Sequence, residues 1–207
     1  MSRGLLIIAA LALGLFVYGL IAVEAERGWH TYVNEEYGFS LRYPDSFSPM
    51  PDTALPMAAM EDAIAGFRLV DGRYYDGTNL DEAAVIVAAR KGVPSLSRCL
   101  QLGMAGLPSG RSWHRRMMGA TVFYRRVLHD AGAGNLYKLI DYRTLHGGTC
   151  YTLTLFIHWS NIGAFSPGAV SPFDEGAVLR ELERVLQAFR FLRQPTARLQ
   201  TPPERVD

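Results

Sequence analysis

The stretch Asn135–Trp159 reads NLYKLIDYRTLHGGTCYTLTLFIHW, and it decides the fold. Two runs rich in aromatic and β-branched residues flank Gly147-Gly148, which is the pattern of a β-hairpin with a two-residue turn. Counting outward from that turn places His146 opposite Thr149 and sets the register of every pair behind them. The segment therefore predicts two long antiparallel strands.

This register places a polar stripe on one face of the hairpin, because opposed residues point the same way and neighbours along a strand alternate. The other face is apolar and is expected to meet the core. One hypothesis is an anion or small-ligand site, in which Arg143 supplies a fork of donors and His158 titrates near neutral pH. The alternative is a solvated face on which Asp141 and Arg143 neutralise each other. The polar stripe consists of Tyr137, Asp141, Arg143, Thr152, Thr154 and His158.

Strand patterns continue upstream of this hairpin. Residues 113–119 and 121–130 are short strand-like runs separated by glycine, so they extend the hairpin into a four-stranded meander. Residues 83–91 are almost continuously apolar, as in a central strand buried on both faces. Residues 29–33 and 37–44 are rich in aromatics and predict a first hairpin with its turn at residues 34–36.

Two helices are expected apart from these strands. Ser95 can cap a short helix that contains Cys99. Ser171–Asp174 supplies a cap, a first-turn proline and an acidic third residue, so it predicts the start of a longer helix. Its apolar stripe is Val178, Leu182, Val185 and Phe189. Strands in runs with separate helices indicate an α+β fold, in which an antiparallel β-sheet is sandwiched between helices.

The length and the charge limit the possible functions. The chain has 207 residues and a formal net charge of +1. This length allows one ordinary domain with appendages. The near-neutral charge gives no global electrostatic case for nucleic acid. Arginine pairs such as Arg125-Arg126 could contact anionic lipid or glycan, but on a strand the two side chains point to opposite faces.

The N-terminus has the composition of an export signal. The segment Gly4–Val23 contains no charge and follows Arg3, as in a secretory signal peptide. At about 1.5 Å per residue it reaches about 30 Å, which also suits an uncleaved membrane anchor. We interpret residues 1–25 as a signal peptide or a signal anchor. Both place residues 26–207 outside the cytoplasm, in the periplasm or on the outer side of the cytoplasmic membrane. Residues 194–207 predict a disordered tail.

Cys99 and Cys150 are the two cysteines of the chain. An even pair in an exported chain is normally bridged, which favours a disulfide. Two free thiols or a shared metal are the alternatives. The spacing is neither that of a redox CxxC motif nor that of a zinc ribbon.

Several motifs together resemble the PsbP-like family. The segment NEEYGFSLRYPDSF at residues 34–47 resembles the opening strand of that family, and residues 78–87 and 186–191 resemble two of its later segments. The resemblance covers residues 29–193, and residues 130–158 look like a bacterial subgroup of secreted proteins. It implies an antiparallel sheet between helices. It does not imply an enzyme, since known members include an extrinsic subunit of photosystem II and a Ran-binding nuclear transport factor.

We therefore expect a non-catalytic exported accessory or binding module that acts through protein–protein contacts with an unknown envelope protein. No catalytic residue, cofactor or nucleic acid is expected, and the membrane is contacted only through the N-terminal segment. The alternative is binding of a small ligand at the polar stripe, or of copper by Met50, Met57 and Met60, whose thioethers suit Cu(I). A hydrolase is the weakest hypothesis, because GLPSG is not a Gly-x-Ser-x-Gly elbow.

Overall fold

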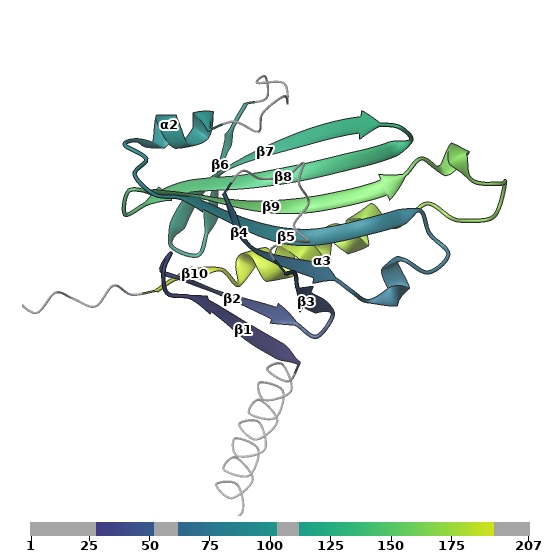
Figure 1. Cartoon of the computed structure of the whole chain (residues 1–207), viewed down its shortest axis with the longest axis horizontal. Coiled ribbons are helices and arrows are strands. Elements are labelled where there is room, and N and C mark those ends of the chain that lie inside the picture. The colour runs from purple at the N-terminus through teal and green to yellow at the C-terminus, as the bar shows by residue number, and fades with distance from the viewer. Residues whose placement is uncertain (1–27, 52–61, 103–111, 193–207) are drawn as a thin grey trace, which may run out of the picture.

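The computed structural model describes residues 28–51, 62–102 and 112–192, which form two antiparallel sheets, two α-helices and two short 3-10 helices (Figure 1). The expected signal segment 1–25 and tail 194–207 lie outside these residues. Of the helices within them, none is long and apolar enough to cross a membrane. The elements are β1 (Trp29–Asn34), β2 (Phe39–Pro44), β3 (Phe47–Pro49), β4 (Ala63–Leu69), η2 (Gly72–Tyr74), β5 (Leu80–Arg90), α2 (Leu96–Gln101), β6 (His114–Met118), β7 (Thr121–Gly132), β8 (Asn135–His146), β9 (Thr149–Ser160), η3 (Ile162–Ala164), α3 (Glu175–Gln187) and β10 (Arg190–Phe191).

The larger sheet has seven strands in the order β3-β4-β5-β9-β8-β7-β6. The meander β6 to β9 is confirmed, and His146 pairs with Thr149 as the glycine turn predicts. Strand β5 lies between β4 and β9, and its residues Ala83–Val87 are fully buried. The antiparallel sheet of the expected α+β fold is therefore present, with the apolar run at its centre.

One face of this sheet is covered by α3, which lies between the seven-stranded sheet and the smaller one (Figure 1). The predicted stripe is confirmed: Val178, Leu182 and Val185 are fully buried and pack with the sheet's core residues. The predicted start of the helix is three residues too early. Asp174 is the N-cap and accepts a hydrogen bond from the Ala177 amide at 2.9 Å, whereas the backbone of Ser171 is engaged in a β-bridge with Thr78.

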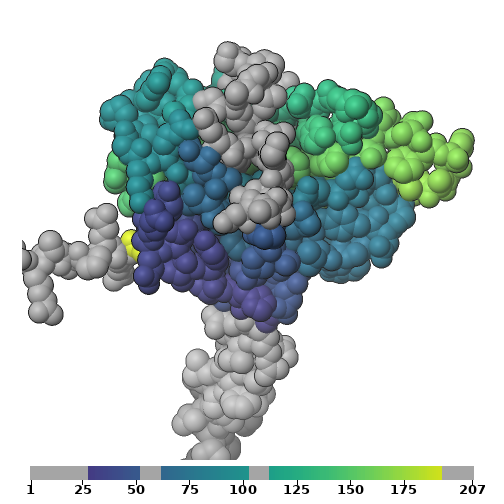
Figure 2. All heavy atoms as spheres, in the orientation of Figure 1, coloured from purple at the N-terminus to yellow at the C-terminus, as the bar shows by residue number. Residues whose placement is uncertain are grey.

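The first hairpin pairs as predicted, from Trp29 with Pro44 to Asn34 with Phe39. It does not join the larger sheet, however. Strand β2 pairs on its other side with β10, and these three strands form a separate small sheet. The turn occupies residues 35–38, because Gly38 adopts the positive φ of 65° that closes it. Figure 2 shows the hairpin (purple) at the surface beside β3 and β4 (blue).

The opposite face of the larger sheet is covered less completely by helix. Ser95 caps α2 as predicted, by accepting a hydrogen bond from the Arg98 amide at 3.2 Å. A disulfide joins Cys99 of this helix to Cys150 of β9, with 5.5 Å between the Cα atoms. Helices therefore lie on both sides, as expected, but α2 has six residues and contacts one end of the sheet. The result is a sandwich dominated by its sheets.

Candidate functional site

The polar stripe has the register that the sequence predicts. Asp141 opposes Thr154, Arg143 opposes Thr152, and Tyr137 opposes His158. The six residues do not form one site, however. Leu139 and Phe156 form the pair that lies between Asp141–Thr154 and Tyr137–His158, and they belong to an apolar cluster on this face. Six residues of strand also separate Tyr137 from Arg143 by about 20 Å.

Asp141 is the centre of a buried ionic network. Its side chain is fully buried, and Oδ1 accepts a hydrogen bond from the Thr154 hydroxyl at 2.7 Å. Oδ2 accepts a hydrogen bond from Arg126 Nε at 3.1 Å and lies 3.7 Å from Nη2 of Arg143. A buried carboxylate is tolerated only when it is paired and hydrogen-bonded, and these three partners meet that need. The carboxylate is therefore engaged within the protein.

Arg143 links the C-terminal end of α2 to the sheet by hydrogen bonds. It is 4% exposed, and Nη1 donates hydrogen bonds to the backbone oxygens of Cys99 at 3.1 Å and Leu102 at 2.5 Å. Both carbonyls lie at the C-terminal end of α2, where Leu102 is the C-cap and the Cys99 carbonyl also accepts from the Leu102 amide at 3.3 Å. Its guanidinium carbon also lies 5.3 Å from the ring centroid of Trp113. Burial lowers the pKa of Arg143 to about 10, so the side chain stays charged near neutral pH.

The Arg126 and Trp113 contacts were missed by the sequence reasoning. Arg126 opposes Asp141 across β7 and β8, and its guanidinium carbon lies 4.6 Å from the Trp113 centroid. The signal was present: Ala133-Gly134 forms a two-residue turn with positive φ at both positions, and counting back from it gives this pair. The glycine-rich segment around the turn offered more than one position for it.

Tyr137 and His158 form a second, smaller group at the other end of the stripe. Their rings stack at 4.6 Å between centroids, with 13° between the planes. His158 Nε2 lies 2.8 Å from Oδ1 of Asn135 and 3.7 Å from Oδ2 of Asp81. Both residues are half-buried. This arrangement orients the imidazole at the sheet surface, without any contact to Arg143.

The methionine hypothesis is only partly covered by the described residues. Met50 is 9% exposed and packs in the apolar cluster with Leu139 and Phe156, where it fills core volume. Met57 and Met60 lie outside the described residues, so the copper site stays a prediction. Within the described ranges, no three His, Cys, Asp or Glu side chains are grouped as metal ligands.

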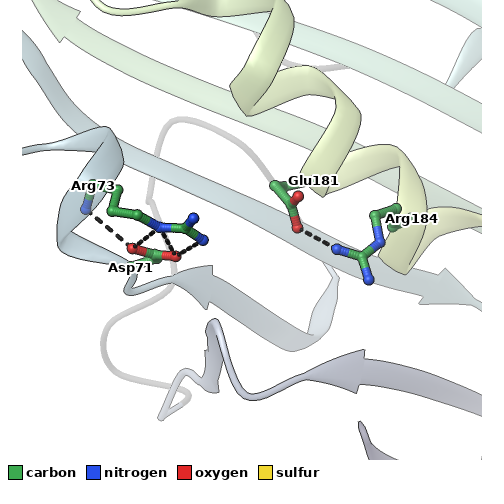
Figure 3. Close-up of polar contacts among 4 residues, drawn as sticks. All are labelled: Asp71, Arg73, Glu181 and Arg184. Carbon is green, nitrogen blue, oxygen red and sulfur yellow. Dashed lines mark hydrogen bonds and ion pairs between the residues drawn. The ribbon is translucent and has the colours of Figure 1, made fainter. Parts of the chain in front are cut away.

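Two ion pairs lie near each other on another surface, between η2 and α3 (Figure 3). Arg73 binds Asp71 through its guanidinium and its backbone amide, and these hydrogen bonds hold the pKa of the Asp71 carboxyl below its ordinary value. Arg184 donates to Glu181 at 2.9 Å. Each carboxylate faces its own arginine, so the group is locally neutral.

An open groove of about 420 Å³ lies where β6 faces the C-terminal half of α3. Tyr142 and Leu186 line it and are buried, whereas Arg116 and Arg190 line it and are exposed. Arg125 donates to the Tyr142 hydroxyl at 3.2 Å. Burial raises the pKa of Tyr142, so the hydroxyl stays protonated at neutral pH. The groove combines a buried base of Tyr142 and Leu186 with polar lining residues that include Arg116, Arg190 and Glu183.

No protein-family model matches the chain, and no curated protein matches it. Solved structures do match. The chain is similar to a crystal structure of a protein from Bacteroides thetaiotaomicron, with 12% identity and a TM-score of 0.49, over 79% of this chain and 48% of that one. It therefore spans about half the length of that protein.

Two further solved structures match a similar share of this chain. One is the solution structure of a cyanobacterial PsbP (CyanoP) from Synechocystis sp. PCC 6803, with 12% identity and a TM-score of 0.38, over 79% of this chain and 92% of that one. The other is LpqN of Mycobacterium tuberculosis, described as involved in cell envelope biogenesis, with 13% identity and a TM-score of 0.44, over 77% and 87%. A PsbP is thus among the structures that this chain is similar to, as its motifs predict.

Proposed function

We propose that the protein is a non-catalytic, exported binding module that acts through protein–protein contacts at the cell envelope. One observation carries this proposal. The two charged side chains of the polar stripe, Asp141 and Arg143, are buried and form hydrogen bonds with other parts of the chain. A catalytic or ligand-binding carboxylate must reach a substrate, and Asp141 reaches Arg126 and Thr154 instead. The groove and the strand beside it offer exposed polar groups.

The extracytoplasmic location is supported by two features of the chain. The uncharged segment Gly4–Val23 suits either a signal peptide or a membrane anchor. The Cys99–Cys150 disulfide fits an oxidising compartment. The anchored and the released forms both present residues 28–192 to envelope proteins.

Binding of a small anion is a second candidate function, and one observation on Arg143 favours it. Arg143 Nε is a buried side-chain nitrogen without a hydrogen-bond partner in the described part of the chain. Calorimetric titration of the full chain with inorganic phosphate and with acetate tests it. Binding that is lost in Arg143→Lys would favour this candidate, because lysine lacks the fork of donors. Titrations without heat above dilution would remove it.

Affinity capture from detergent-solubilised envelope tests the leading proposal. The full chain carries a photo-crosslinker at Met117, which is 54% exposed, or in a second chain at Val33, which is 50% exposed on β1. We expect one envelope protein to crosslink in stoichiometric yield from at least one exposed position. Turnover of a small-molecule substrate that survives in the absence of any crosslinked partner would contradict the proposal.

A further inference from the structure

The two edges of the seven-stranded sheet differ in how open they are. At one edge, β3 is three residues long and ends in Pro49, which has no N–H to offer. At the other edge, β6 has five residues and no proline, and its first four residues are exposed. Among the described strands, β6 pairs only with β7. The β6 edge therefore presents a row of backbone groups to a further strand.

The register shows which backbone groups of β6 face outward. Met118 opposes Thr121 across the two-residue turn Gly119-Ala120, and such a closing pair exchanges both of its hydrogen bonds. Alternation then directs the N–H and C=O groups of Arg116 toward β7 and those of Arg115 and Met117 away from it. Two residues of β6 thus face outward and could bind an added strand without disturbing the hairpin. The Arg115 carbonyl accepts a hydrogen bond from Arg116 Nη1 at 3.1 Å, which an added strand would replace.

The charge around this edge is mainly positive. Arg115 belongs to β6 and is exposed, and Arg116 and Arg190 stand on the rim of the adjacent groove. Glu183 is the acidic residue that lines the groove. Arg116 donates to the backbone oxygen of Arg115, and Arg190 donates to backbone oxygens at the end of α3. These acceptors are neutral backbone oxygens. In these hydrogen bonds, no carboxylate compensates the positive charges of the two guanidinium groups.

We propose that β6 binds an extended, acidic segment of a partner protein by β-strand addition. Backbone hydrogen bonds to Arg115 and Met117 would supply affinity, and side chains of the partner on alternate positions would reach the cationic groove. A second copy of this chain fits the edge poorly, because two β6 strands would bring their arginines together. The inference rests on the proposed binding function and names the surface and the chemistry of the partner.

The probe is a fluorescent ten-residue peptide of alternating glutamate and valine, with a lysine–valine peptide as its control. Fluorescence anisotropy with the full chain in detergent, at low salt, gives the affinities. We expect the acidic peptide to bind at least about tenfold more tightly than the basic one. Hydrogen–deuterium exchange should show protection at the amides of residues 115 and 117. Equal affinities, or protection confined to another element, would overturn the inference.

Two pairs of variants separate the backbone from the charge. Met117→Pro removes an outward N–H and should weaken binding about tenfold, whereas Met117→Ala keeps that N–H and should retain most of the affinity. Arg116→Gln with Arg190→Gln should also lose about tenfold. Its charge-matched control, Arg73→Gln with Arg184→Gln, changes arginines that line no part of the groove and should bind as wild type. Circular dichroism confirms that each variant is folded.

The outcomes distinguish this inference from the proposed function. If the acidic peptide fails to protect β6 while an envelope protein still crosslinks to the chain, the edge proposal is wrong and the binding module stands. If neither binds, both are wrong. Loss of binding in Met117→Ala as large as in Met117→Pro would assign the contact to the side chain and contradict strand addition.

Discussion

On the face of the seven-stranded sheet that meets α3, most buried side chains are apolar, whereas on the opposite face Asp141 and Thr154 are fully buried. The α3 face is stabilised by the transfer of side chains such as Leu182 out of water. The opposite face contains the ion pair between Arg126 and Asp141. It also contains α2, which is linked to the sheet by hydrogen bonds from Arg143 and by the disulfide. Polar residues at alternate positions of a strand therefore do not by themselves mark a ligand site, since their partners can lie inside the fold.

The comparison is sharpest at Asp141. Asp141→Ala should lower the free energy of unfolding by about 3–5 kcal/mol, because it leaves the buried Arg143 and the partly buried Arg126 without their carboxylate. Urea unfolding followed by fluorescence measures this loss. Asp130→Ala is the control, since Asp130 is exposed on the neighbouring strand and should cost under about 0.5 kcal/mol. Equal small losses would mean that the network contributes little to the fold.

The disulfide tests how far the same face depends on a covalent link. Replacing Cys99 and Cys150 with alanine opens a loop with a sequence separation of 51 residues. The chain-entropy model gives a loss of up to about 4 kcal/mol. Guanidinium unfolding of the variant, beside wild type with and without reductant, measures it. A variant as stable as oxidised wild type would show that Arg143 alone holds α2 in place.

Leu182 represents the apolar face. Leu182→Ala should cost about 3 kcal/mol, because the side chain is fully buried between α3 and the sheet and its removal leaves a cavity. Leu179, on the same helix but only partly buried, is the control and should lose less on truncation. Thermal and urea unfolding measure both. Equal losses would contradict the assignment of Leu182 to the centre of the core.

A smaller effect concerns a polar group on the apolar face. Burial raises the pKa of Tyr75 to about 12, and its hydroxyl donates to the Leu69 carbonyl at 2.7 Å. An unfolded tyrosine ionises near pH 10, so the unfolded chain loses a proton between pH 10 and 12 that the folded chain keeps. Stability contributed by this group is full below pH 10 and falls as the pH rises.

The fall should be about 1–2 kcal/mol, reduced by the partial exposure of the ring. Urea unfolding at pH 8, 10 and 11 measures it, and Tyr75→Phe should flatten this part of the profile. An equally steep fall in the phenylalanine variant would assign the alkaline loss to other tyrosines, such as Tyr142 and Tyr151, whose pKa values burial also raises.

Much of the fold follows from local patterns. The glycines between Leu145 and Cys150 set a register that the structure reproduces residue by residue, because a two-residue turn leaves no freedom of pairing. The apolar stripe of α3 follows from its spacing in the same way. The separate small sheet does not, since the pairing of β10 with β2 joins segments about 150 residues apart and depends on how α3 packs.

The sequence predicts where the residues of the polar stripe lie on the sheet, but not whether they are buried. The residues opposite each other on the polar stripe follow from the register, but their burial depends on what covers the face. Arg143 is covered because Cys99 of α2 and its C-cap residue Leu102 supply carbonyls to it, and Trp113 lies against its guanidinium. These contacts join residues about 30 to 45 positions apart, and periodicity carries no information about them. The groove depends likewise on β6, β8 and α3 together.

The central claim is that the buried polar face maintains the fold and the open β6 edge binds the partner. One measurement tests it directly: the free energy of unfolding and the affinity for the acidic peptide, determined together for Asp141→Asn and for Arg116→Gln with Arg190→Gln. We predict that the first variant loses more than about 2 kcal/mol of stability and keeps its affinity while folded. The second should keep its stability and lose about tenfold in affinity. If folded Asp141→Asn lost the affinity and the arginine pair did not, the roles assigned to the two regions would be contradicted.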